Sequence, residues 1–232
     1  MSATMAGHAN LVKPGPQWVL VLACISLLAA KFWLVPRLNI NWDEFHFLSQ
    51  VHEAGRGELT QGLQSAHVHL FGWMPGLGMD EIAQVNLGRT LMVVLLGISA
   101  LLATRIAASW FTSESAWIAA LALLATWPTL KHGGSFRADS LLLPLQLGAI
   151  LLLVRPGSGD RGRGLAAGAL LGAATVLSIK AILLAPVIAA IGLADPRGWR
   201  QGFRRMAYLV AGATTTAGIL LGAHLAWLGG PK

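Results

Sequence analysis

The stretch "LAAGALLGAATVLSIKAILLAPVIAAIGL" (165–193) decides how many times this chain crosses a membrane. It is apolar except for Lys180 near its middle, and Pro186 follows shortly after. A helix needs about 20 residues to cross the roughly 30 Å of bilayer hydrocarbon. The stretch is therefore either one overlong helix or two short helices with Lys180 at the turn between them.

The composition of the whole chain predicts an all-α, polytopic membrane helix bundle. Of its 232 residues, 55% are hydrophobic and 12% are charged, whereas a soluble domain has about 25% charged residues. Apolar runs of spanning length form one membrane domain over residues 1–232. The predicted spans are 17–35, 87–108, 116–130, 140–154, 165–179, 181–193 and 206–228.

Loop charge favours two helices in the stretch at 165–193. Seven spans put three basic loops on the side of the N-terminus, which is the positive-inside pattern, whereas a single helix would put the last two loops on opposite sides. We therefore expect a cytoplasmic N-terminus in a bacterial inner membrane. The net charge of +7 then sets orientation and does not indicate a nucleic-acid surface. The three loops contain Arg105; Arg155, Arg161 and Arg163; and Arg197, Arg200, Arg204 and Arg205.

The first loop, 36–86, then lies outside the cytoplasm and is too long for a simple turn. We expect a helix over Phe45–Val51 with Asp43 as its N-cap. A second amphipathic helix is expected from about Asp80 to the second span. Glycines interrupt the sequence between them. The loop is predicted to place interfacial helices over the ends of the spans.

Charged residues from four parts of the chain meet at this outer face in the predicted topology. They are the pair Asp43 and Glu44, Arg89 at the start of the second span, "FRAD" at 136–139, and Lys180. Each alone is explained as an interface anchor or a helix cap. Their common placement favours a polar cavity, because ionisable groups at membrane depth are costly unless they are paired or solvated.

Histidines near the acidic pair raise the alternative of a metal site. His46 follows Asp43 by three residues, which places both on one helix face. His67 and His69 add two candidate ligands for a divalent cation such as Mg²⁺, Mn²⁺ or Zn²⁺. The spacing matches no established metal motif, and no glycine-rich nucleotide-binding motif occurs in the chain. A transferase without a nucleotide-binding site needs an activated substrate that is delivered within the membrane.

Four stretches, in this order, resemble the GT-C superfamily of polytopic glycosyltransferases, which includes protein O-mannosyltransferases and lipid A aminoarabinose transferases. The acidic pair resembles the family's first-loop motif, and the second stretch resembles a loop that ends in Arg before the second span. The other two resemble its R-x-D-x-L segment and its segment in which a Lys ends a short span. The stretches are "DEFHFLSQVHEAGRGEL" (43–59), "HLFGWMPGLGMDEIAQVNLGRTLMVVL" (69–95), "FRADSLLLPLQLGAILLLVR" (136–155) and "GALLGAATVLSIKAILLAP" (168–186).

The resemblance implies transfer of a sugar from a polyprenyl-phosphate donor to an extracytoplasmic hydroxyl or amine, with inversion. It implies that Asp43 is the catalytic base or a metal ligand, with Glu44 beside it. Asp139 is implied as a second metal or donor contact, and His46 joins Asp43 and Asp139 in the candidate metal set. Lys180, with Arg137 or Arg89, is implied to bind the donor phosphate. Besides the lipid-linked sugar, the expected partner of this chain is the lipid bilayer.

The chain departs from the family pattern in two ways. "HVHLFGWMP" (67–75) stands where the family usually has His-Pro-Pro. The chain also resembles only the N-terminal seven-span module, whereas family members usually continue with further spans and often an outer soluble domain. The alternative is a non-catalytic subunit of this fold within a larger membrane complex. A third reading is a transporter fragment with Lys180 at a broken helix. We favour the enzyme.

Overall fold

A computed structural model describes residues 17–154, 160–194 and 198–230, and all regular structure within these ranges is helical. The all-α prediction is confirmed. The helices that pack along one another are α1 (Gln17–Leu34), α4 (Glu81–Ala107), α5 (Ser113–Ala125), α7 (Ala138–Val154), α8 (Asp160–Leu177), α9 (Ala185–Leu193) and α10 (Trp199–Gly229). The short elements are η1 (Val35–Arg37), α2 (Trp42–Arg56), α3 (Val68–Phe71), η2 (Met74–Leu77), α6 (Trp127–His132) and η3 (Ile179–Leu184).

Three helical segments within the described ranges are long and apolar enough to cross a membrane. They are Gln17–Arg37, Glu81–Ala107 and Trp199–Gly229. Three shorter apolar segments are Ser113–Ala125, Ala138–Val154 and Ile179–Leu193. The chain thus has the helices of a membrane protein, while the count of seven spans stays a prediction.

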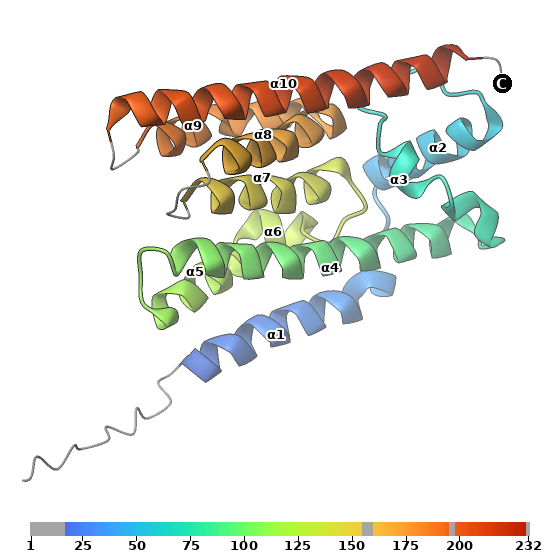
Figure 1. Ribbon diagram of the computed structural model, residues 1–232. Coiled ribbons are helices and arrows are strands. Elements are labelled where there is room, and N and C mark those ends of the chain that lie inside the picture. Colours follow the sequence, from blue (N-terminus) through green and yellow to red (C-terminus); the bar gives the residue numbers. More distant parts are fainter. Residues whose placement is uncertain (1–16, 155–159, 195–197, 231–232) are drawn as a thin grey trace, which may run out of the picture.

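The first loop, 36–86, forms a helical cap at one end of the bundle. Figure 1 shows α2 and α3 gathered beside the start of α4 and the end of α10. A buried apolar cluster holds the cap to the bundle, because Phe47 of α2 and Phe71 of α3 pack with residues of α4, α7 and α8. The expectation that this loop carries helices is confirmed.

Helices α8 and α10 approach each other closely because glycines line their contact. A Cβ atom at Gly168 would overlap the carbonyl oxygen of Leu209, and one at Gly212 would overlap that of Leu165. Small residues permit this backbone approach, which is a common way for helices to associate in membranes. The pair fixes α8, and therefore the turn that begins at Ser178.

Several helix ends differ from the sequence predictions, for local reasons. Asn41, rather than Asp43, caps α2, because its side chain accepts from the Glu44 N–H while Glu44 accepts from the Asn41 N–H. Asp80 caps α4 directly, so the second amphipathic segment and the second span are one helix. By contrast, the predicted division of the stretch at 165–193 is confirmed, because α8 and α9 are separate helices joined by η3, which contains Lys180.

Some of the residues on which the predicted orientation depends are outside the described ranges. The N-terminal segment 1–16 and two residues of the basic loops, Arg155 and Arg197, lie there. The basic residues Arg105, Arg161 and Arg200 stand in or beside the ends of α4, α8 and α10.

Candidate functional site

Four charged side chains from three parts of the chain form a continuous row, which we call the charged row. Arg137 Nη2 lies 2.9 Å from Asp43 Oδ2 and 3.6 Å from Asp139 Oδ2. Lys180 Nζ donates to both oxygens of Asp139, at 3.0 and 3.1 Å. The row joins α2, the start of α7 and η3. The structure therefore brings together four of the predicted site residues.

The charged row lines a polar pocket of about 290 Å³. Asp43 and Lys180 are about half exposed there, and Arg137 is the most buried member. Side-chain amides and a hydroxyl complete the wall beside the charges. The polar pocket is lined further by His46, Phe47, Gln50, Gln61, Gln64 and Ser178.

An apolar pocket of about 540 Å³ adjoins the same row. Its wall includes Leu142, Leu143 and Leu184, and Arg137, Asp139 and Lys180 line it as well as the polar pocket. Three charged residues thus stand at the junction of a polar and an apolar cavity. This arrangement suits an amphiphile, whose charged group and hydrocarbon chain need different surroundings.

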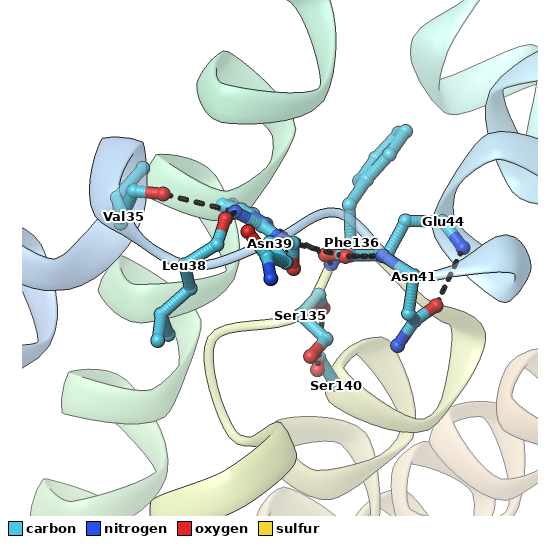
Figure 2. A network of polar contacts seen from close by, with 9 residues as sticks. Val35, Leu38, Asn39, Asn41, Glu44, Ser135, Phe136 and Ser140 are labelled. Atoms are coloured by element: carbon cyan, nitrogen blue, oxygen red, sulfur yellow. Dashed lines mark hydrogen bonds and ion pairs between the residues drawn. The ribbon is translucent and has the colours of Figure 1, made fainter. Parts of the chain in front are cut away.

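Glu44 and Arg89 lie apart from this row, in a buried pair of their own. Arg89 Nε and Nη2 donate to Glu44 Oε1 and Oε2 at 2.8 and 2.6 Å. Its remaining N–H groups donate to the carbonyls of Val35, Leu38 and Asn39. Figure 2 shows Val35, Leu38 and Asn39 on the chain that leads to Asn41 and Glu44. All five donors of the guanidinium are used, so Arg89 organises the chain that leads into α2.

The contacts of Glu44 stabilise its charged form. Burial alone would raise the pKa of this carboxyl, but hydrogen bonds from Arg89 and the N–H groups of Phe136 and Asn41, with the Arg89 charge, lower the pKa below its ordinary value. The Phe136 N–H donates to Glu44 Oε1 at 2.9 Å. Glu44 therefore ties the segment before α7 to the start of α2.

Phe136 brings Arg137 into the site by packing against α4. Its ring is fully buried and meets the rings of Phe47 and Phe71 edge-on, at centroid distances of 5.0 and 4.9 Å. A Cβ atom at Gly88 would stand 2.5 Å from the ring of Phe136. Only glycine leaves room for this contact, which positions the next residue, Arg137.

The predicted metal ligands line the polar pocket, but a guanidinium stands between two of them. Asp43, Asp139 and His46 all lie on its wall, and Arg137 pairs with both carboxylates. The part of the chain that the structure describes contains no group of three or more His, Cys, Asp or Glu side chains placed to hold a metal ion. In this arrangement the positive charge between the two carboxylates is that of Arg137, and the metal site stays a prediction.

Two histidines of the first loop, His67 and His69, make contacts within the cap and with α10. His67 stacks on Phe47 at a centroid distance of 3.5 Å, and its Nε2–H donates to the Phe47 carbonyl at 3.0 Å. His69 Nε2 lies 2.8 Å from His224 Nδ1, and His224 Nε2 lies 2.9 Å from Ser65 Oγ. This contact joins the loop to α10 and was not predicted. The signal available in the sequence was an ionisable residue, His224, within an apolar span.

Three glutamines of the polar pocket also escaped prediction. Gln50 Nε2 donates to Gln61 Oε1 at 2.8 Å, and Gln64 has a left-handed backbone with φ of 59°. A non-glycine residue in that region is uncommon and tends to occur at functional sites. Glutamines are ordinary in polar loops, so the sequence carried no signal for them.

Comparisons with known proteins add no relative. No family model, no curated protein and no solved structure matches this chain.

Proposed function

We propose that this protein is a membrane glycosyltransferase of the GT-C kind, which transfers a sugar from a polyprenyl-phosphate donor to an extracytoplasmic hydroxyl or amine. The observation that carries the proposal is the position of the charged row at the junction of the polar and apolar pockets. A lipid-linked sugar has a phosphate between a hydrocarbon chain and a polyhydroxylated group. The apolar pocket, the charged row and the polar pocket match the hydrocarbon chain, the phosphate and the sugar, in that order.

In this proposal, Arg137 and Lys180 hold the donor phosphate. They are the two cations of the charged row, and each lines both pockets. A bound phosphate takes over hydrogen bonds that the two carboxylates now accept. The same cations stabilise the charge that develops on the phosphate as the bond to the sugar breaks, which is most effective when the cations are held in place. The polyprenyl chain lies against the leucines of the apolar pocket, and the glutamines face the sugar.

Asp43 is the general base of the proposed reaction. The acceptor oxygen or nitrogen attacks the anomeric carbon from the face opposite the phosphate. The bond from that carbon to the phosphate oxygen then breaks, and the polyprenyl phosphate leaves. Asp43 takes the acceptor proton, for which it must lie within hydrogen-bond reach of the acceptor. Its side chain is 55% exposed and contacts Arg137, so phosphate binding at Arg137 releases Asp43 for this role.

Seven crossings in a bacterial inner membrane, with the N-terminus in the cytoplasm, complete the proposal. Helices α1, α4 and α10 have spanning length, and α5, α7 and the pair η3 and α9 are shorter and apolar. Helix α8 packs against α7 and α10, and we infer that it crosses with them. A span shorter than the bilayer is accommodated by local thinning of the bilayer or by association with neighbouring helices.

The second candidate is a non-catalytic membrane subunit with the same arrangement of helices. The observation that favours it is the internal balance of the charged row, in which two carboxylates neutralise two cations without a ligand. Such a row also serves to hold α2, α7 and η3 together. Donor binding without transfer would support this candidate over the enzyme.

The test is sugar transfer by the purified full chain, with polyprenyl-phosphate hexoses and pentoses as donors and membrane extracts as acceptors. Asp43→Asn removes the proton acceptor and should slow release of polyprenyl phosphate by roughly 10²- to 10⁴-fold, while donor binding persists. Glu53→Gln, on the same helix but outside the pocket, is the control. Transfer at the wild-type rate by Asp43→Asn would remove Asp43 from its role.

A further inference from the structure

A third pocket lies between α1, α6 and the chain that leads into α2. Its volume is about 340 Å³, and its cationic lining comes from Lys31 of α1 and from Lys131 and His132 of α6. We call it the lysine pocket. We propose that the lysine pocket binds the phosphate of an anionic phospholipid headgroup, at a site separate from the charged row.

The lysine pocket carries positive charge that its own residues do not neutralise. Among the described residues that line it, Glu44 is the only carboxylate, and Arg89 already binds it. Lys31 donates to the carbonyl of Leu130, which is neutral. Lys131 is exposed and has no ion-pair partner in the described ranges. Two lysine charges therefore face one cavity and favour an anionic ligand.

Exposed tryptophans place this pocket at the depth of lipid headgroups. Trp18 and Trp33, near the two ends of α1, are each 60% exposed, and at 1.5 Å per residue they are about 22 Å apart along the helix. Tryptophans at both ends of a span mark the two membrane interfaces. Lys31 lies within one turn of Trp33, and Trp127 of α6, which is 72% exposed, precedes Lys131 by one turn.

The rest of the lining favours a lipid over a free phosphate ion. Val35, Leu38 and Val93 provide apolar contact beside the lysines. Asn39 and Ser135 offer polar groups on the same wall. A phospholipid satisfies both kinds of surface, because its glyceride portion covers the apolar residues while its phosphate meets the lysines. A free phosphate would leave the apolar wall against water.

The lysine pocket is distinct from the proposed donor site. Asp43, Arg137 and Lys180 line the polar pocket and do not line this one, whereas His132 lies between the lysine and apolar pockets. The buried pair of Glu44 and Arg89 forms its inner wall. The inference therefore does not depend on the proposed function.

The test is a titration of the purified full chain in neutral detergent, followed by thermal unfolding and by native mass spectrometry. The probes are short-chain phosphatidylglycerol, short-chain phosphatidylcholine and inorganic phosphate. A ligand that binds only the folded protein raises the unfolding temperature as its concentration rises. We expect saturable binding of phosphatidylglycerol, at least about tenfold tighter than that of phosphatidylcholine. Each lysine makes a charge-assisted contact with the phosphate, and in phosphatidylglycerol no choline cation offsets the phosphate charge. Inorganic phosphate should not compete at equal concentration.

The variants are chosen so that misfolding does not imitate lost binding. Lys131→Gln alters an exposed side chain and should weaken phosphatidylglycerol binding by about tenfold, and Lys31→Gln should act in the same direction. Arg56→Gln removes one positive charge from the exposed pair with Glu58 and should bind as the wild type does.

Three results would overturn the proposal. The first is equal phosphatidylglycerol affinity in the wild type, Lys131→Gln and Lys31→Gln. The second is competition by inorganic phosphate at equal concentration. The third is loss of phosphatidylglycerol binding in Lys180→Gln alone. The last result would place the lipid at the charged row.

Discussion

Glu44 and Arg89 stand 45 residues apart in the chain, yet two hydrogen bonds of 2.8 and 2.6 Å join their buried side chains. Asp43, the direct neighbour of Glu44, faces the polar pocket and is 55% exposed. Two adjacent carboxylates therefore have different roles. Glu44 holds the first loop on α4, whereas Asp43 is available to a ligand.

The first prediction separates these roles by stability. Glu44→Gln leaves Arg89 buried without its countercharge, and breaking a buried ion pair costs about 3 to 5 kcal/mol. Asp43→Asn removes an exposed contact, whose cost is about 1 kcal/mol or less. Reversible unfolding in mixed detergent micelles measures both. Equal losses in the two variants would contradict the separate roles.

The second prediction concerns the loss of stability in acid. Burial lowers the pKa of His67 to about 4, from an ordinary value of 6.5, although the carbonyls of Phe47 and Gln64 oppose the shift. The unfolded chain binds the proton more readily, so the stability from this residue is complete above pH 6.5 and is lost as the pH falls toward 4. The loss amounts to about 3 kcal/mol at 1.36 kcal/mol per pKa unit.

Unfolding measured at pH 7, 5.5 and 4 tests this expectation. His67→Gln should flatten the fall in stability over this window, because the variant lacks the buried imidazole whose pKa is lowered by folding. His52→Gln, which alters a histidine paired with Gln84, should retain the fall. An unchanged slope in His67→Gln would show that another group governs the acid response.

The third prediction tests the seven crossings by accessibility. In a Cys24→Ala background, cysteines replace Glu58, Arg161 and Ile179, all of which are exposed. With seven spans, Glu58→Cys and Ile179→Cys react with an impermeant reagent added outside, and Arg161→Cys reacts only after permeabilisation. If only α1, α4 and α10 crossed, positions 161 and 179 would react from the same side.

Much of the fold follows from patterns in the sequence, and the misses have local causes. The predicted span at 87–108 begins late because α4 starts at Glu81, where Asp80 caps it. The predicted span at 116–130 is divided at Thr126, and Pro128 stands in the first turn of α6. The predicted span at 206–228 omits the basic first turns of α10. Hydropathy identifies apolar runs, whereas caps and packing decide where helices begin.

The four members of the charged row were among the predicted residues, but their pairing was not predicted. Charge at membrane depth pointed to Asp43, Arg137, Asp139 and Lys180, which the structure brings together. Arg89 satisfied the same criterion and lies elsewhere, because the sequence does not show that three backbone carbonyls converge on it. The His224 contact with the first loop likewise depends on how α10 packs, and a histidine in an apolar span does not by itself identify its partner.

The measurement that tests the central claim most directly is binding of a polyprenyl-phosphate sugar to purified wild type, Lys180→Gln and Lys180→Arg, with thermal stability followed in parallel. Loss of the Lys180 charge deletes a charge-assisted contact with the phosphate and should weaken binding by about 1.5 to 3 kcal/mol, roughly ten- to a hundredfold. Lys180→Arg should retain part of the affinity because the charge survives. Equal affinities in the three proteins, at equal stability, would contradict the assignment of the charged row as the donor-phosphate site.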